Sequence, residues 1–246
     1  MMRIYGIHPV EELLSVAPDR VTTVYASDPG ASSMETIRKL VANSDALIEP
    51  ADDARLDEMA HGGNHQGVVA EATPFQYVEL DDLFERTEDA SQACVVVLDQ
   101  VQDPQNLGAI LRSAAAMGVD GVVIPKDRAA GVTGAVVRAS SGQAYRVPVA
   151  QITNVARTVD RFKEHGYWSV GADMDADSQD AWDIDFDMKT ALVIGSEHRG
   201  IRRLVREKCD FHARIPMESD VESLNVAAAA TVLFYEIRRQ RLRASD

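Results

Sequence analysis

The chain has 246 residues, of which 46% are hydrophobic, enough to bury the core of one large or two small domains. Its formal net charge of −14 argues against a protein that coats nucleic acid through bulk electrostatics, because phosphate binding relies on Lys and Arg, although local arginine patches are compatible with it. No stretch reaches the roughly 20 apolar residues that cross a bilayer. The first residues lack the continuous hydrophobic segment and the cleavage site of a secretory signal, so none is expected. We therefore expect a cytoplasmic globular protein with no membrane partner.

The first 73 residues alternate between extended and helical patterns, which predicts a small α/β domain. Strands are expected at residues 3–6, 21–26, 46–48 and 68–72, and helices at 9–16, 33–41 and 52–59. Residues 74–92 are rich in Asp, Glu and Thr, with an apolar interruption at Leu80, Leu83 and Phe84, and are interpreted as a linker.

The region 93–246 alternates apolar strands with helices, a pattern typical of a mostly parallel sheet covered on both faces. Strands are expected at 93–98, 121–124, 145–149, 168–171, 191–194 and 212–215, with helices beginning near Leu107, Thr133, Asn154, Ile201 and Leu224. Ligands of such sheets bind beyond the carboxyl ends of the strands. The chain is thus predicted to be an α/β protein with two domains, 1–73 and 93–246.

A first polar corner follows the strand at 93–98. Pro104 restricts Asp103 to an extended conformation, and Asn106 is expected to cap the next helix, where Gly108 permits close backbone approach. Arg112 lies nearly two helical turns further on, so its side chain can reach back to the same corner. Its planar donor fork favours contact with a phosphate or carboxylate.

A second corner is the glycine-bounded loop from Gly195 to Gly200. It is neither a phosphate-binding loop, which needs Gly-Lys-Ser/Thr, nor a dinucleotide G-x-G-x-x-G sequence. Glu197 in this loop either interacts with the dipole of the following helix or pairs with an active-site arginine. Spacing alone leaves both interpretations open.

A third corner joins the strand at 212–215 to an apolar helix through Ser223 and Asn225, for which helix capping is the default interpretation. No nucleophile elbow surrounds Ser223 and no histidine is linked to it in sequence, which disfavours a covalent serine mechanism. The helix is apolar nearly all round, so it either lies in the core or packs against a second subunit.

The cysteines and histidines do not predict a metal site. Cys94 and Cys209 lack Cys-x-x-Cys spacing, and a core position is expected for Cys94. His61 and His65 are four residues apart, but two glycines between them break the helix that a zinc-protease motif needs. No metal is expected.

Together, the three corners resemble the SpoU-type branch of the SPOUT RNA 2′-O-ribose methyltransferases. The matching segments are DPQNLGAILR at 103–112, VIGSEHRG at 193–200, IPM at 215–217 and SLNVA at 223–227. YGIHPVEELL at 5–14 and HQGVV at 65–69 resemble the small substrate-binding domain of the same family. The similarity is greatest to the branch that methylates a guanosine ribose in large-subunit (23S) ribosomal RNA.

This resemblance implies a parallel sheet with a trefoil knot, S-adenosyl-L-methionine as cofactor, large-subunit ribosomal RNA as partner and a homodimer with its sites near the interface. By motif, backbone at Gly195, Ile215 and Leu224 is expected to contact the cofactor. The implied catalytic cluster comprises Asn106, Arg112, Glu197, Ser223 and Asn225.

The resemblance implies that the motif arginine, here Arg112, removes the proton from the ribose hydroxyl. A guanidinium with a pKa above about 12 is a poor base. We therefore hypothesise that Arg112 holds an RNA phosphate and lowers the pKa of the hydroxyl. In this hypothesis Glu197 positions Arg112, while Ser223 and Asn225 orient the loop and the ribose.

Other functions remain open at this point: 2′-O-methylation of transfer RNA, a non-catalytic RNA-binding protein of the same fold, and a nucleotide-dependent enzyme such as a dehydrogenase. Absence of G-x-G-x-x-G weakens the last of these. In an acidic chain, RNA affinity is expected to depend on local arginines and to be strongly salt-sensitive. The candidates are Arg138, Arg146, Arg199, Arg202, Arg203 and a C-terminal cluster of Arg238, Arg239, Arg241 and Arg243.

Overall fold

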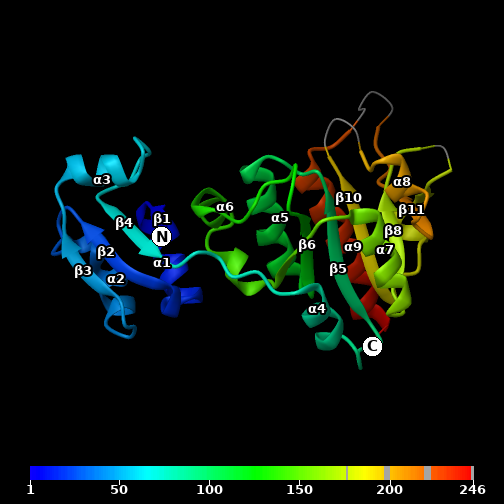
Figure 1. Ribbon diagram of the computed structural model, residues 1–246, viewed down its shortest axis with the longest axis horizontal. Helices are drawn as coiled ribbons and strands as arrows, with labels where there is room; N and C mark the ends of the chain where they lie inside the picture. Colours follow the sequence, from blue (N-terminus) through cyan, green and yellow to red (C-terminus); the bar gives the residue numbers. More distant parts are fainter. Residues whose placement is uncertain (176, 197–199, 219–222, 245–246) are drawn as a thin grey trace. The chain divides into compact units, whose positions relative to one another are not determined.

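The structure, a computed structural model, describes residues 1–175, 177–196, 200–218 and 223–244 (Figure 1). Its contacts divide the chain into two compact units. The first contains Met1–Gln76 and Val132–Arg146, and the second contains Tyr77–Gly131 and Val147–Asp246.

The first unit contains a four-stranded sheet in the order β1-β4-β2-β3, in which β4 is antiparallel to both of its neighbours. The strands are β1 (Met2–Tyr5), β2 (Val21–Ala26), β3 (Leu47–Pro50) and β4 (Val68–Ala72), and the helices are α1 (Ile7–Val16), α2 (Glu35–Val41) and α3 (Asp53–Met59). Short 3₁₀ turns lie at Pro18–Arg20 and Ser32–Met34. The small α/β pattern predicted for this region is confirmed.

A later segment completes the first unit, which the sequence did not predict. Helix α6 (Gly134–Ala139) and a 3₁₀ turn at Gln143–Arg146 pack against α1 and β1. The Arg138 guanidinium lies 3.8 Å from the centroid of the Tyr5 ring, and burial lowers its pKa. Gly134 is needed because a Cβ there would lie 2.3 Å from the carbonyl oxygen of Arg3. Arg138, expected as an RNA contact, thus has a packing role.

The second unit is built on a seven-stranded parallel sheet in the order β7-β6-β5-β10-β8-β11-β9. The strands are β5 (Ala93–Asp99), β6 (Gly121–Pro125), β7 (Val149–Ile152), β8 (Trp168–Ala172), β9 (Gln179–Asp180), β10 (Lys189–Gly195) and β11 (Phe211–Arg214). Cys94 is buried in β5, as expected. The predicted parallel sheet is confirmed.

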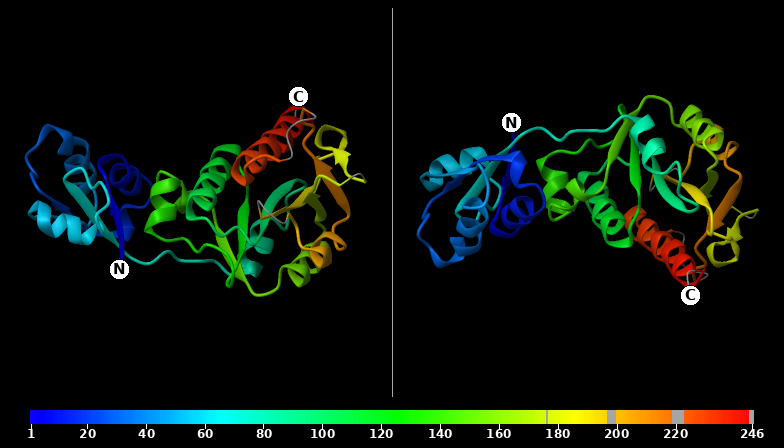
Figure 2. Two further views of the ribbon diagram at one scale, coloured as in Figure 1. Left: turned by 90° about the horizontal axis from the view of Figure 1, so that it is seen from above. Right: turned by 90° about the horizontal axis from the view of Figure 1, so that it is seen from below.

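Helices cover both faces of this sheet (Figure 2). Helices α4 (Leu80–Arg86), α7 (Val155–Glu164) and α8 (Arg203–Arg206) share one core cluster with alternate side chains of β5 and β10. On the other face, α5 (Pro104–Met117) packs against α9 (Val226–Ala244). In the described part of the chain no helix is long and apolar enough to span a membrane.

Two local predictions for this region were wrong. The expected linker contains α4, because Leu80, Leu83 and Phe84 occupy i, i+3 and i+4 positions and are buried in the core. The strand expected at 145–149 begins at Val149, after the 3₁₀ turn and Pro148, which has no N–H to donate to a sheet.

The trefoil knot stays a prediction. The loops that join β10 to α8 and β11 to α9 include residues 197–199 and 219–222, which lie outside the described residues.

Candidate active site

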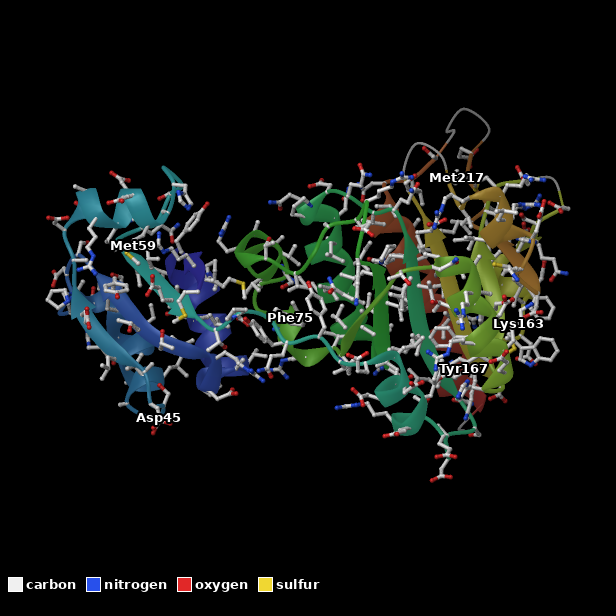
Figure 3. All side chains as sticks on the ribbon, in the orientation of Figure 1. Asp45, Met59, Phe75, Lys163, Tyr167 and Met217 are labelled. Carbon is white, nitrogen blue, oxygen red and sulfur yellow. The ribbon has the colours of Figure 1, made fainter. Side chains whose placement is uncertain are left out.

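A cavity of about 250 Å³ opens at the carboxyl ends of β8, β10 and β11, the edge where the polar corners were predicted to meet. All three residues expected to contact a cofactor, Gly195, Ile215 and Leu224, line it, and so does Ser223. The wall also includes Met217, which Figure 3 labels, and apolar residues of α9. The structure therefore brings the second and third corners into one site.

Gly195 is fixed by close backbone packing. A Cβ at this position would lie 2.0 Å from the carbonyl carbon of Gly200. Ser196 and Gly200 exchange two backbone hydrogen bonds, of 3.1 and 2.9 Å, and Gly200 has a φ of +60°. Close packing at Gly195 and the positive φ of Gly200 thus explain why this corner begins and ends with glycine. Glu197 lies outside the described residues.

Asn225 is both a helix cap and a link between corners. Its Oδ1 accepts hydrogen bonds from the N–H groups of Ala227 and Ala228, at 3.0 and 3.3 Å, as the capping interpretation predicts. Its Nδ2 donates to Asn106 Oδ1 at 2.9 Å. Two residues 119 positions apart in the sequence are thereby joined.

Asn106 is not the cap of α5. The helix begins at Pro104, and Asp103 caps it by accepting a hydrogen bond from the N–H of Gln105 at 3.0 Å. Proline fits the first helical position because its missing N–H would have no partner there. Asn106 therefore lies within the first turn, where its side chain meets Asn225. Arg112 is exposed two turns along α5 and does not line the cavity.

A buried carboxylate that the sequence analysis did not single out supports the same edge. Asp99 is fully buried at the end of β5 and pairs in register with Gly195. It accepts hydrogen bonds from the N–H of Arg202 at 3.0 Å and from its Nε at 2.8 Å. A buried charge needs such partners. Arg202, expected as an RNA contact, therefore fixes the chain that follows Gly200.

The segment after β8 is rich in aspartate, and its carboxylates form ion pairs with α8. Three of its carboxylates, those of Asp173, Asp175 and Asp177, converge on the guanidinium of Arg206 in α8. Hydrogen bonding to Asp173 raises the pKa of Arg206. Asp173 and Met174 also line the cavity. The ion pairs therefore hold one wall of the site, an arrangement that the spacing of the aspartates alone did not indicate.

The cavity is suited to a ligand with an apolar body, because its walls are mainly aliphatic. Over the residues that the structure describes, no group of three or more His, Cys, Asp or Glu side chains could hold a metal ion.

Comparison with known proteins is consistent with this geometry. The chain is 40% identical over 243 residues to the 23S rRNA (guanosine-2′-O-)-methyltransferase RlmB of Pseudomonas aeruginosa, covering 97% of this chain and 96% of that protein. It is 45% identical over 208 residues to YacO of Bacillus subtilis, named for the TrmH family of tRNA/rRNA methyltransferases, covering 84% and 83%.

Among solved structures, the SpoU methyltransferase AviRb of Streptomyces viridochromogenes, in complex with AdoMet, has a TM-score of 0.77 and 27% identity. The match covers 98% of this chain and 90% of AviRb.

Two family matches cover most of the sequence. Residues 3–78 match the family described as RNA 2′-O ribose methyltransferase substrate binding. Residues 93–235, more than half of the chain, match the SpoU rRNA Methylase family. The chain therefore belongs to the SpoU rRNA methylase family of RNA methyltransferases.

Proposed function

We propose that this protein transfers a methyl group from S-adenosyl-L-methionine to the ribose 2′-hydroxyl of a guanosine in large-subunit (23S) ribosomal RNA. The observation that carries the proposal is the cavity in which Gly195, Ile215, Ser223 and Leu224 converge beside Asn225. The similarity to RlmB supports the guanosine and the 23S RNA. The substrate-binding family match supports the ribose hydroxyl.

The residues of the cavity fit the cofactor. Residues Gly195, Ile215 and Leu224 lie on its walls, and most of the remaining lining is aliphatic. When bound, S-adenosyl-L-methionine supplies an electrophilic methyl group on a sulfonium. The protein then has to exclude water and orient the ribose for in-line attack.

We assign the orientation of the substrate to the polar residues beside the cavity. The hydrogen bond between Asn225 and Asn106 fixes the start of α9 against the first turn of α5. Arg112, on the same helix as Asn106, binds an RNA phosphate and lowers the pKa of the nearby hydroxyl. Ser223 orients the loop and the ribose, and Glu197 positions Arg112.

Methyl transfer can be measured with radiolabelled S-adenosyl-L-methionine and 23S ribosomal RNA from cells that lack this protein. We expect one 2′-O-methylguanosine to form and to map to a position that is unmodified in those cells. Methylation of transfer RNA instead would overturn the rRNA assignment. Cofactor binding without transfer to any RNA would favour the non-catalytic alternative.

We also propose that the protein acts in the cytoplasm as a homodimer that buries the exposed apolar side of α9. This side carries Val232, Tyr235 and Leu242, which are 44%, 58% and 57% exposed. Exposed apolar patches of this kind are typical of interfaces. Light scattering should give twice the chain mass, and a monomer would contradict the proposal.

Replacing Asn225 with Ala is expected to lower kcat by about 30-fold, because the start of α9 loses its contact with Asn106 at the site. Loss of the helix cap should also destabilise the fold by about 1 kcal/mol. Asp52→Ala is the matched control, since Asp52 caps α3 in the first unit through the N–H of Arg55 at 2.8 Å. The kcat and melting temperature are measured for both variants. Equal losses of kcat would show that Asn225 acts only as a helix cap.

Replacing Arg206 with Met is expected to raise the Kd for S-adenosyl-L-methionine by about fivefold to tenfold while kcat at saturating cofactor stays within about twofold. The reason is that Asp173, which lines the cavity with Met174, loses the ion pair with Arg206 that holds it in place. Arg203→Met is the control, because Arg203 lies on the same helix and pairs with Glu207 at the surface. Calorimetry with the cofactor would contradict this role if both variants bound it like the wild type.

A further inference from the structure

A second cavity, of about 310 Å³, lies outside the proposed active site, past the ends of β6 and β7. Lys126 directly follows β6, and Thr153 and Asn154 directly follow β7. Arg157 and Arg161 reach the cavity from α7. The cavity therefore opens at the same carboxyl edge of the sheet as the active site.

The cations of this cavity differ in their partners. Arg161 pairs with Asp81, and its guanidinium carbon lies 5.4 Å from the centroid of the Phe84 ring. Lys126 and Arg157 are exposed, and their side chains form neither an ion pair nor a hydrogen bond with any residue that the structure describes. In a chain with a net charge of −14, two uncompensated cations on the wall of one cavity are unusual.

The one carboxylate on the wall of this cavity, that of Glu79, lies at the start of α4. Glu79 is the N-cap residue of α4. Its charge therefore compensates the helix start. Lys126 and Arg157 remain available to an anion from outside the protein.

The donor groups favour a phosphate. A lysine ammonium acts as a point charge and an arginine guanidinium as a planar fork, and both types bind phosphate oxygens. The Thr153 hydroxyl is a further donor on the wall. No residue on the wall is aromatic, so the wall offers no ring on which a nucleobase could stack. The chemistry fits the backbone of a nucleic acid better than a free nucleotide.

The spacing also fits an RNA strand. β7 and β10 are three strand positions apart in the sheet. At roughly 4.8 Å per strand this is about 14 Å, a distance that a few nucleotides of an RNA strand can span. A strand whose ribose lies at the active site can therefore reach this cavity along one edge of the sheet.

We infer that Lys126 and Arg157 form a binding site for a backbone phosphate of the substrate RNA, a few nucleotides from the methylated ribose. This inference rests on the proposed function, because it takes RNA as the substrate. The site fixes the register of the strand and reads no base.

The test compares Lys126→Gln, Arg157→Gln and the double variant with the wild type in RNA binding at several salt concentrations. Each single variant is expected to raise the Kd by about threefold to tenfold and to lower the salt slope by about 1. KM for RNA should rise, while kcat and the Kd for S-adenosyl-L-methionine stay unchanged. Lys189→Gln is the control, since it removes the same charge at the start of β10, on the opposite edge of the sheet.

The outcomes separate this site from the proposed function. If the wild type methylates RNA but the variants match it in Kd and salt slope, the phosphate site is wrong and the function stands. If Lys189→Gln lost as much RNA affinity as the two single variants, the effect would come from total charge, and the phosphate site would again be wrong. Calorimetry with inorganic phosphate tests a further outcome. If phosphate binds the wild type but not the double variant, while the two proteins bind RNA equally well, the cavity is a site for a free anion and the RNA-phosphate site is wrong. A wild type that binds no RNA overturns both proposals.

Discussion

Replacing Arg112 with Lys is expected to lower the single-turnover rate of methyl transfer by about 100-fold. Lysine keeps the positive charge but loses the planar donor fork that binds a phosphate in a fixed orientation. Because Arg112 is exposed on α5 and does not line the cavity, the fold and the affinity for S-adenosyl-L-methionine should be preserved. Rapid-quench measurements with saturating enzyme give the rate, and calorimetry gives the cofactor affinity.

The same substitution separates two roles for this residue. If Arg112 removed the proton from the hydroxyl, lysine, with a reference pKa near 10.4, would be a better base than a guanidinium. An Arg112→Lys variant as fast as the wild type would therefore contradict the role of the fork. Arg86→Lys provides the control, because Arg86 is exposed on α4 and does not line the cavity.

Much of the fold could be predicted because its strands and helices have clear periodicity. The buried strands β5, β6 and β10 are nearly continuous apolar runs, and both regions 1–73 and 93–246 contain the predicted alternation of strands and helices. Helix α4 was missed because its charged residues resemble a linker, although three apolar side chains anchor it. The position of α6 depends on long-range contacts, such as Arg138 on Tyr5, which local pattern does not contain.

The candidate site was predictable to the extent that motifs specify backbone. Glycine, asparagine and serine at strand ends indicated where the chain turns, and the structure places Gly195, Ser223 and Leu224 on one cavity. Side-chain partners were less predictable. Nothing in the sequence of the aspartate-rich segment after β8 points to Arg206, which lies 29 residues beyond Asp177 and is brought close to it by the fold.

Replacing Gly195 with Ala is expected to abolish detectable binding of S-adenosyl-L-methionine and to destabilise the protein. The added Cβ would lie 2.0 Å from the Gly200 carbonyl carbon and 2.2 Å from the Ile201 nitrogen. These are backbone atoms, so no side chain can rotate away, and the loop after β10 has to move. Overpacking of this kind costs about 2–3 kcal/mol, which corresponds to a fall in melting temperature of about 5–10 °C.

The displaced loop accounts for the loss of binding as well as stability, because Ser196 and Gly200 both line the cavity. Gly30→Ala is the matched control: its Cβ would approach only the flexible Asp28 carboxylate, at 3.3 Å. Thermal melts with and without S-adenosyl-L-methionine measure both effects, since a ligand that binds the folded state raises the melting temperature. If the cofactor stabilised Gly195→Ala as strongly as the wild type, the close packing at Gly195 would not be needed for binding. The cofactor would then be held by the walls at Ile215 and Leu224.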